Sequence, residues 1–208
     1  LKLVSESHVD NFYYRPRTTY EMLQKYSEGI IATSACIAGI IPRCIDDGAF
    51  AEAKEWAQKF AALYEPGDFY IELQDHGLEE DNTVLPQLIK LARETGIPMA
   101  ATNDAHYLRK EDAKMQSILL CIQTGKTIQD ADRMEFQTDE FYVKTTDEMY
   151  ELFSMVPEAC ANTAKIAEQC NFDFEFGHTK IPYYKAPDGM DNQAYFEKLC
   201  WDGLERRY

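Results

Sequence analysis

The sequence predicts an α/β fold in which parallel strands alternate with helices and a mainly helical extension follows. Short apolar runs typical of buried strands alternate with segments whose apolar residues recur every three or four positions, as in amphipathic helices. This alternation is the pattern of βαβ units, whose strands lie parallel. The 208 residues, 45% apolar and 12% aromatic, are enough to bury the core of one domain or of one domain with an appendage.

The first part of the chain is expected to hold short elements around the strands. The aromatic stretch at 12–17 is expected to be irregular because Pro16 restricts the residue before it. Thr18 or Thr19 is expected to cap a short helix that ends near Lys25. The expected strands are 29–33, 68–73 and 97–101, the first and last of them buried, with a tight turn at 34–39 after the first.

Two amphipathic helices are expected to connect these strands. Apolar residues recur at helical spacing over 46–64, and Asp46 or Asp47 is expected near the start of that helix. The second helix is expected over 79–95, where Gly96 supplies the stop.

An acidic cluster at 79–81 and apolar residues within 110–123 indicate the character of two of the helices. Glu79–Asp81 is expected to be a solvated acidic cluster in the first turn of its helix. A helix is expected over 110–123, and 127–146 is expected to form a short hairpin or an irregular strand pair. The apolar stripe of the helix at 110–123 consists of Met115, Ile118, Leu119 and Ile122.

The last part of the chain is expected to be mainly helical. A domain change is expected between Asn171 and Pro187, a region with several glycines and prolines. The expected helices are 147–154, 157–170 and 192–207, with a phenylalanine-rich connector at 172–176.

The net charge, the cysteine pattern and the lack of long apolar runs limit the classes of protein to which the chain can belong. The net charge of −15 argues against a surface devoted to nucleic acid, and Arg15 to Arg17 is the only small basic candidate near the N-terminus. The six cysteines form no Cys-x-x-Cys pair, which favours reduced thiols. With no apolar run of membrane-spanning length and no signal peptide, a cytoplasmic protein without a membrane partner is expected. Both ends, Leu1 and Tyr208, are expected to be cut from something longer.

Polar side chains at three strand ends form the candidate site. Asp104 and His106 follow the strand at 97–101, and residues i and i+2 of an extended strand point to the same face. An oxygen and an imidazole nitrogen suit zinc or manganese, and Cys36 at another strand end adds a sulfur ligand. His76 follows the strand between them. An Asp-x-His pair is also common by chance, so a purely structural role stays open.

Two other catalytic patterns are rejected. Gly125–Thr127 lacks the upstream glycine of a P-loop, because Leu120 stands at that position. A hydrolase built from Ser34 or Cys36 with His106 lacks a Gly-x-Ser-x-Gly elbow.

Several stretches resemble the bacterial replicative DNA polymerase III alpha subunits, in the later part of their N-terminal polymerase-and-histidinol-phosphatase (PHP) domain. The resemblance runs from end to end, and the motifs are specific when taken together. They are KLVS (2–5), FYYRPR (12–17), SACIAG (34–39), ELQDHG (72–77), ATNDAHYL (101–108), QTGKT (123–127), TDEFY (138–142) and NTAKIAEQCN (162–171).

The resemblance implies a partial PHP-type (β/α) barrel with a multinuclear metal site, which in some members is a 3′–5′ exonuclease. It maps three ligands for Zn²⁺ or Mn²⁺ onto Cys36, Asp104 and His106, and leaves His76 as a residue that supports the ligands or faces the substrate. Residues 1–172 would be the later PHP domain with its helical extension, and 173–208 a connector and the start of the palm region. The family's first ligands and its palm carboxylates have no counterpart in the sequence.

For function, the resemblance implies a parent DNA-directed DNA polymerase, a nucleotidyltransferase that uses DNA, deoxynucleoside triphosphates and Mg²⁺. Its partners would be replisome subunits, namely the clamp and a proofreading exonuclease. The piece alone is expected to be inactive. One alternative is a non-catalytic module that docks a replisome partner. Another is a stand-alone metal-dependent phosphoesterase, which is disfavoured because the chain has only four histidines and no His-x-His.

Overall fold

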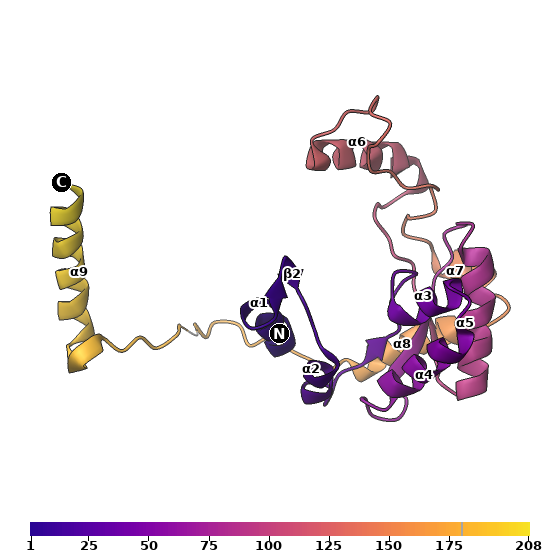
Figure 1. Ribbon diagram of the computed structural model, residues 1–208, viewed down its shortest axis with the longest axis horizontal. Coiled ribbons are helices and arrows are strands. Elements are labelled where there is room, and N and C mark those ends of the chain that lie inside the picture. The colour runs from indigo at the N-terminus through magenta and orange to yellow at the C-terminus, as the bar shows by residue number, and fades with distance from the viewer. Residues whose placement is uncertain (180) are drawn as a thin grey trace. The chain divides into compact units, whose positions relative to one another are not determined.

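The computed structural model describes residues 1–179 and 181–208 (Figure 1). The chain divides into two compact units, Leu1–Cys170 and Asn171–Tyr208. The first unit holds the sheet and the candidate site, and the second contains one long helix.

A three-stranded parallel sheet lies at the centre of the first unit. Its strands are β3 (Ala32–Thr33), β4 (Phe69–Leu73) and β5 (Met99–Ala101), in the order β3-β4-β5. Both strand pairs are parallel, as predicted. The α/β prediction is therefore confirmed, and the strand ends meet at one edge of the sheet.

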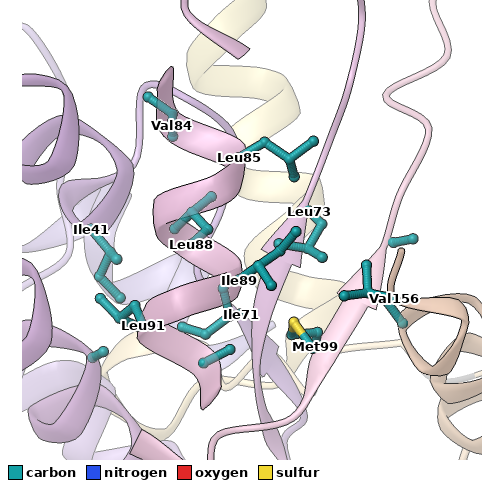
Figure 2. Close-up of a cluster of buried hydrophobic side chains, with 14 of the residues drawn as sticks. Ile41, Ile71, Leu73, Val84, Leu85, Leu88, Ile89, Leu91, Met99 and Val156 are labelled. Carbon is teal, nitrogen blue, oxygen red and sulfur yellow. The ribbon is translucent and has the colours of Figure 1, made fainter. Parts of the chain in front are cut away.

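Helices cover the sheet and form the core with it. The sequence connects β3 to β4 through α3 (Ile40–Asp46) and α4 (Phe50–Ala61), and β4 to β5 through α5 (Asp81–Thr95). Figure 2 shows part of the core, with side chains of α5 beside the strands. Its labelled members are Ile41, Ile71, Leu73, Val84, Leu85, Leu88, Ile89, Leu91, Met99 and Val156.

The helix α8 (Pro157–Gln169) returns to the sheet and packs against β5. Asn162 of α8 is buried, and its Nδ2 donates a hydrogen bond to the carbonyl oxygen of Met99 at 2.8 Å. Lys165 in turn donates to Oδ1 of Asn162 at 2.9 Å. A side chain from a distant helix thus satisfies a backbone group of β5.

The N-terminal part differs from the expectation of an irregular stretch. After α1 (Lys2–Val9), the strands β1 (Phe12–Tyr13) and β2 (Arg15–Pro16) form a short antiparallel hairpin. Proline lacks a backbone N–H and cannot donate to a strand ladder. It is tolerated in this edge strand because no donor is needed at that position. The next helix, α2 (Tyr20–Lys25), confirms the predicted cap, since Oγ1 of Thr19 accepts from the Met22 N–H.

Two expectations around β3 and α4 were wrong. The strand expected over 29–33 is reduced to Ala32–Thr33, and it is not buried because it lies at an edge of the sheet. The helix expected over 46–64 is present as α4 but is shorter at both ends, and Asp46 ends the preceding helix α3 rather than starting α4. Gly48, with φ of +75°, lies between them in a conformation that breaks a right-handed helix.

The elements after β5 follow the prediction in position. A 3₁₀ turn, η1 (Lys110–Asp112), leads into α6 (Ala113–Thr124), and α7 (Thr146–Leu152) precedes α8. The stretch between α6 and α7 is irregular, and its Tyr142 forms a parallel bridge with Tyr107, which precedes α6. Three members of the predicted apolar stripe of α6 face solvent, namely Met115, Leu119 and Ile122.

The elements described in the second unit are a 3₁₀ turn, η2 (Pro187–Gly189), and α9 (Asn192–Arg207). The bounds of α9 agree with the sequence expectation. Asp191 caps this helix by accepting from the N–H groups of Gln193 and Ala194. Among the described residues, no helix combines the length and the apolar character needed to cross a bilayer.

Replacing Asn162 with alanine tests the contact between α8 and β5. We expect Asn162→Ala to lower the free energy of unfolding by about 1–3 kcal/mol, because the buried carbonyl of Met99 loses its side-chain donor. Urea denaturation measures this change. The exposed neighbour Thr163→Ala is the control and should change stability by less than about 0.5 kcal/mol. Equal stability of the two variants would contradict the role given to Asn162.

Candidate functional site at the strand ends

Residues that follow the three parallel strands meet at one cavity of about 190 Å³. Cys36 follows β3, His76 follows β4 and Asp104 follows β5, and all three line the cavity. The carboxyl ends of parallel strands are where sites form in folds of this class. The cavity wall also includes apolar side chains of α5, among them Leu85 and Leu88.

The turn after β3 holds Cys36 through an unusual backbone. Ala35 has φ of +66°, a left-handed conformation that is uncommon for a residue with a Cβ atom. The Gly39 N–H donates to the carbonyl oxygen of Cys36 at 2.7 Å. A Cβ atom on Gly39 would lie 2.6 Å from the carbonyl oxygen of Ser34, so only glycine fits at this position.

Asp104 and His106 lie together after β5. The Nε2 of His106 is 3.3 Å from Oδ1 of Asp104, and both side chains are 40% exposed. The sequence argument for their proximity was wrong, because β5 ends at Ala101 and Asp104 has φ of +43°. A turn, rather than the alternation of an extended strand, brings the two side chains together.

His76 is buried and joins two of the strand ends. Its ring stacks on Phe141 with the centroids 4.3 Å apart, and its Nε2 lies 3.3 Å from the carbonyl oxygen of Asn103. Its backbone N–H donates to Oδ2 of Asp81 at 2.9 Å. Asp81 is therefore buried and bonded to the turn before α5, which corrects the expectation of a solvated acidic cluster for this residue.

The segment before α7 packs over the site. Thr138 donates its hydroxyl to the carbonyl oxygen of His76 at 2.7 Å, and the His106 N–H donates to the carbonyl oxygen of Phe141 at 2.8 Å. Glu140 accepts a hydrogen bond from Lys110, which holds the pKa of the Glu140 carboxyl below its ordinary value. These bonds fix the segment against the residues that follow β4 and β5.

A carboxylate network crosses the sheet beside the cavity. Glu72 of β4 accepts hydrogen bonds from the hydroxyls of Thr33 and Thr102, which lie at the ends of the two neighbouring strands. Gln74 donates to both Glu72 and Thr102. Sequence reasoning missed Glu72, although a single acidic residue inside an apolar strand was a signal that could have identified it.

The donor side chains at the strand ends supply only some of the ligands that a metal ion needs. Asp104 pairs with His106, and Cys36 shares the cavity with Asp104, but His106 packs instead against Phe136 and Phe141. Within residues 1–179 and 181–208, no three His, Cys, Asp or Glu side chains gather closely enough to hold a metal. Catalytic zinc sites use three protein ligands, so these residues alone do not form a complete site.

Comparison with known proteins shows which family model and which proteins this chain is similar to. Residues 1–76 match the sequence model of the PHP domain family. Proteins named DNA polymerase III subunit alpha match the whole chain: 45% identity over 210 residues for the one from Borreliella burgdorferi, and 38% over 218 residues for the one from Thermus aquaticus. The relative from Treponema pallidum is 41% identical over 207 residues, 99% of the chain.

The parallel α/β fold is consistent with a partial PHP-type fold, in line with the match of residues 1–76 to that family. Over its whole length, the chain is similar to one segment of the proteins named DNA polymerase III subunit alpha. It spans about 18% of the length of these three relatives.

Two substitutions in the turn after β3 should have opposite effects on stability. Gly39→Ala should lower the free energy of unfolding by about 1–3 kcal/mol, because its Cβ would press on the backbone of Ser34. Ala35→Gly should raise it by about 1 kcal/mol, because glycine adopts positive φ without strain. Thermal and urea unfolding of both variants measure the effects, and a change of the same sign in both would refute this description of the turn.

Proposed function

We propose that the chain is the PHP region of a replicative DNA polymerase of the DNA polymerase III alpha type. The complete protein would synthesise DNA on a DNA template from deoxynucleoside triphosphates, using Mg²⁺. The observation that carries this proposal is the similarity along the entire chain to proteins with that name, at 45% identity for the first of them. By itself the chain would be a scaffold without polymerase activity.

The strand-end residues are proposed to contribute to a metal site that extends beyond this chain. Cys36, Asp104 and His106 would be ligands for Zn²⁺ or Mn²⁺, and the remaining ligands would come from elsewhere in the complete protein. Their placement after β3 and β5, with Asp104 and His106 already 3.3 Å apart, supports this assignment. His76 would position Asp104 through its contact with the carbonyl oxygen of Asn103. A 3′–5′ exonuclease activity would require the completed site.

The two parts of the chain are proposed to have different roles. Residues 1–172 would be the later PHP domain with its helical extension, and 173–208 would connect it to the palm. The proposed replisome partners are the clamp and a proofreading exonuclease.

Docking of such a partner is a second candidate function. The helix α6 supports it, because Met115, Leu119 and Ile122 lie at helical spacing and are 59%, 53% and 72% exposed. An apolar face of this kind is typical of interaction surfaces.

A chimera tests the leading proposal. The matching segment of the Borreliella burgdorferi protein would be replaced by this chain, and primer extension would be measured. We expect activity within about tenfold of the parent, a difference of about 1.4 kcal/mol in the barrier. The same chimera carrying Leu91→Asp, which places a charge in the core, is the control for a misfolded segment. A folded chimera without DNA synthesis would contradict the proposal.

Metal content tests the ligand assignment separately. The full 208-residue chain and a Cys36→Ser, Asp104→Asn, His106→Gln variant would be dialysed against Zn²⁺ and analysed by mass spectrometry. Because the site is incomplete in this chain, we expect less than one equivalent, but measurably more on the chain than on the triple variant. Cys170→Ser, which removes an exposed thiol, should behave as the unmodified chain. Equal metal content in the chain and the triple variant would remove these residues from any metal site.

A further inference from the structure

The β1–β2 hairpin presents a row of aromatic side chains to solvent. Phe12, Tyr13 and Tyr14 are 58%, 61% and 83% exposed, and Tyr14 forms the apex with φ of +59°. The residues flanking the apex, Tyr13 and Arg15, are paired across the hairpin. Large aromatic rings exposed side by side are unfavourable in water, and such patches on folded proteins mark binding surfaces.

The charge of the hairpin is opposite to that of the whole chain. Arg15 and Arg17 are exposed, and residues 11–20 contain no Asp or Glu, although the chain carries a net charge of −15. Among the described residues, neither arginine has a carboxylate within ion-pair distance, whereas Lys25 and Lys110 do. The guanidinium of Arg17 lies over the ring of Tyr13, 4.9 Å from its centroid. Uncompensated arginines beside aromatic rings favour a ligand with phosphates and flat rings.

The helices beside the hairpin hold its base in place. Glu6 of α1 accepts hydrogen bonds from Lys25 and Tyr26 at the end of α2. Nδ2 of Asn11, immediately before the hairpin, lies 3.2 Å from the sulfur of the buried Met22 in α2. Figure 1 shows β2 next to α1, and both strands contact that helix. Because the hairpin is ordered before binding, less conformational entropy is lost when a ligand docks.

We propose that residues 12–17 bind single-stranded DNA. The rings of Tyr13 and Tyr14 meet edge to face, with centroids 4.6 Å apart and 77° between their planes. They therefore stack on two bases that are splayed apart from each other, and Arg15 and Arg17 contact the neighbouring phosphates. Aromatic stacking needs an exposed base face, which an unpaired strand offers and a duplex does not. The proposed binding of DNA by the hairpin is separate from the polymerase function proposed above. It rests on that function only in naming DNA, rather than another polyanion, as the ligand.

Fluorescence anisotropy with a labelled oligothymidylate and the full 208-residue chain tests the proposal. In Tyr13→Thr/Tyr14→Asn, where Asn tolerates the positive φ at the apex, the affinity should fall about fivefold or more for each stacked base. In Arg15→Ala/Arg17→Ala, the slope of log affinity against log salt should decrease by about 0.7 for each phosphate that the variant no longer neutralises. Circular dichroism verifies that each variant is folded.

Matched variants remove the same groups from exposed positions elsewhere. Phe172→Ala/Phe174→Ala deletes two exposed aromatic rings, and Arg206→Ala/Arg207→Ala deletes two exposed cations. Each double variant should keep the affinity for the oligonucleotide within about twofold of the unmodified chain. This change is smaller than the effect of losing one stacked base. The proposal is overturned if the chain does not bind the oligonucleotide, if the hairpin variants bind as well as these controls, or if duplex DNA binds equally well. Binding is measured without synthesis, so an inactive chimera with intact binding, or the reverse, separates this proposal from the polymerase proposal.

Discussion

The burial of the central strand β4 is the constraint on which the rest of the first unit depends. Parallel strands are stable when helices cover them. Phe69, Ile71 and Leu73 alternate along β4 and belong to the core, whereas Glu72 between them is only half-buried and faces the hydroxyls of the neighbouring strands. One face of the strand thus packs in the core, and the other carries the buried Tyr70 followed by Glu72, which lines the cavity at the carboxyl end.

The sequence predicts the fold best where a periodic pattern coincides with burial. The strands β4 and β5 lie within their expected bounds for that reason. The helix α9 also has its expected bounds, although none of its residues is buried. The helix α3 was missed because its apolar start contains Pro42, which was not recognised as a residue of a first helical turn. The exposure of β3 depends on its place at the sheet edge, which no local pattern encodes.

The candidate site was predictable only in part. Cys36, His76 and Asp104 meet because parallel strands end at one edge, and this follows from the fold class. The backbone turn at Asp104 and the burial of Asp81 depend on partners distant in sequence, such as the N–H of His76. The exposure of the apolar face of α6 was not predictable for the same reason. Its apolar pattern is that of a core helix, but no neighbouring element among the described residues covers Met115, Leu119 and Ile122.

The hydrogen bond between Asn162 and Met99 has a consequence for how the chain folds as it is made. The two residues are 63 positions apart, so β5 leaves the ribosome well before the side chain that satisfies its carbonyl. At synthesis rates of about 5–20 residues per second, this edge of the nascent sheet stays unprotected for about 3–13 s. During that stage of synthesis, the edge of β5 is open to pairing with other chains.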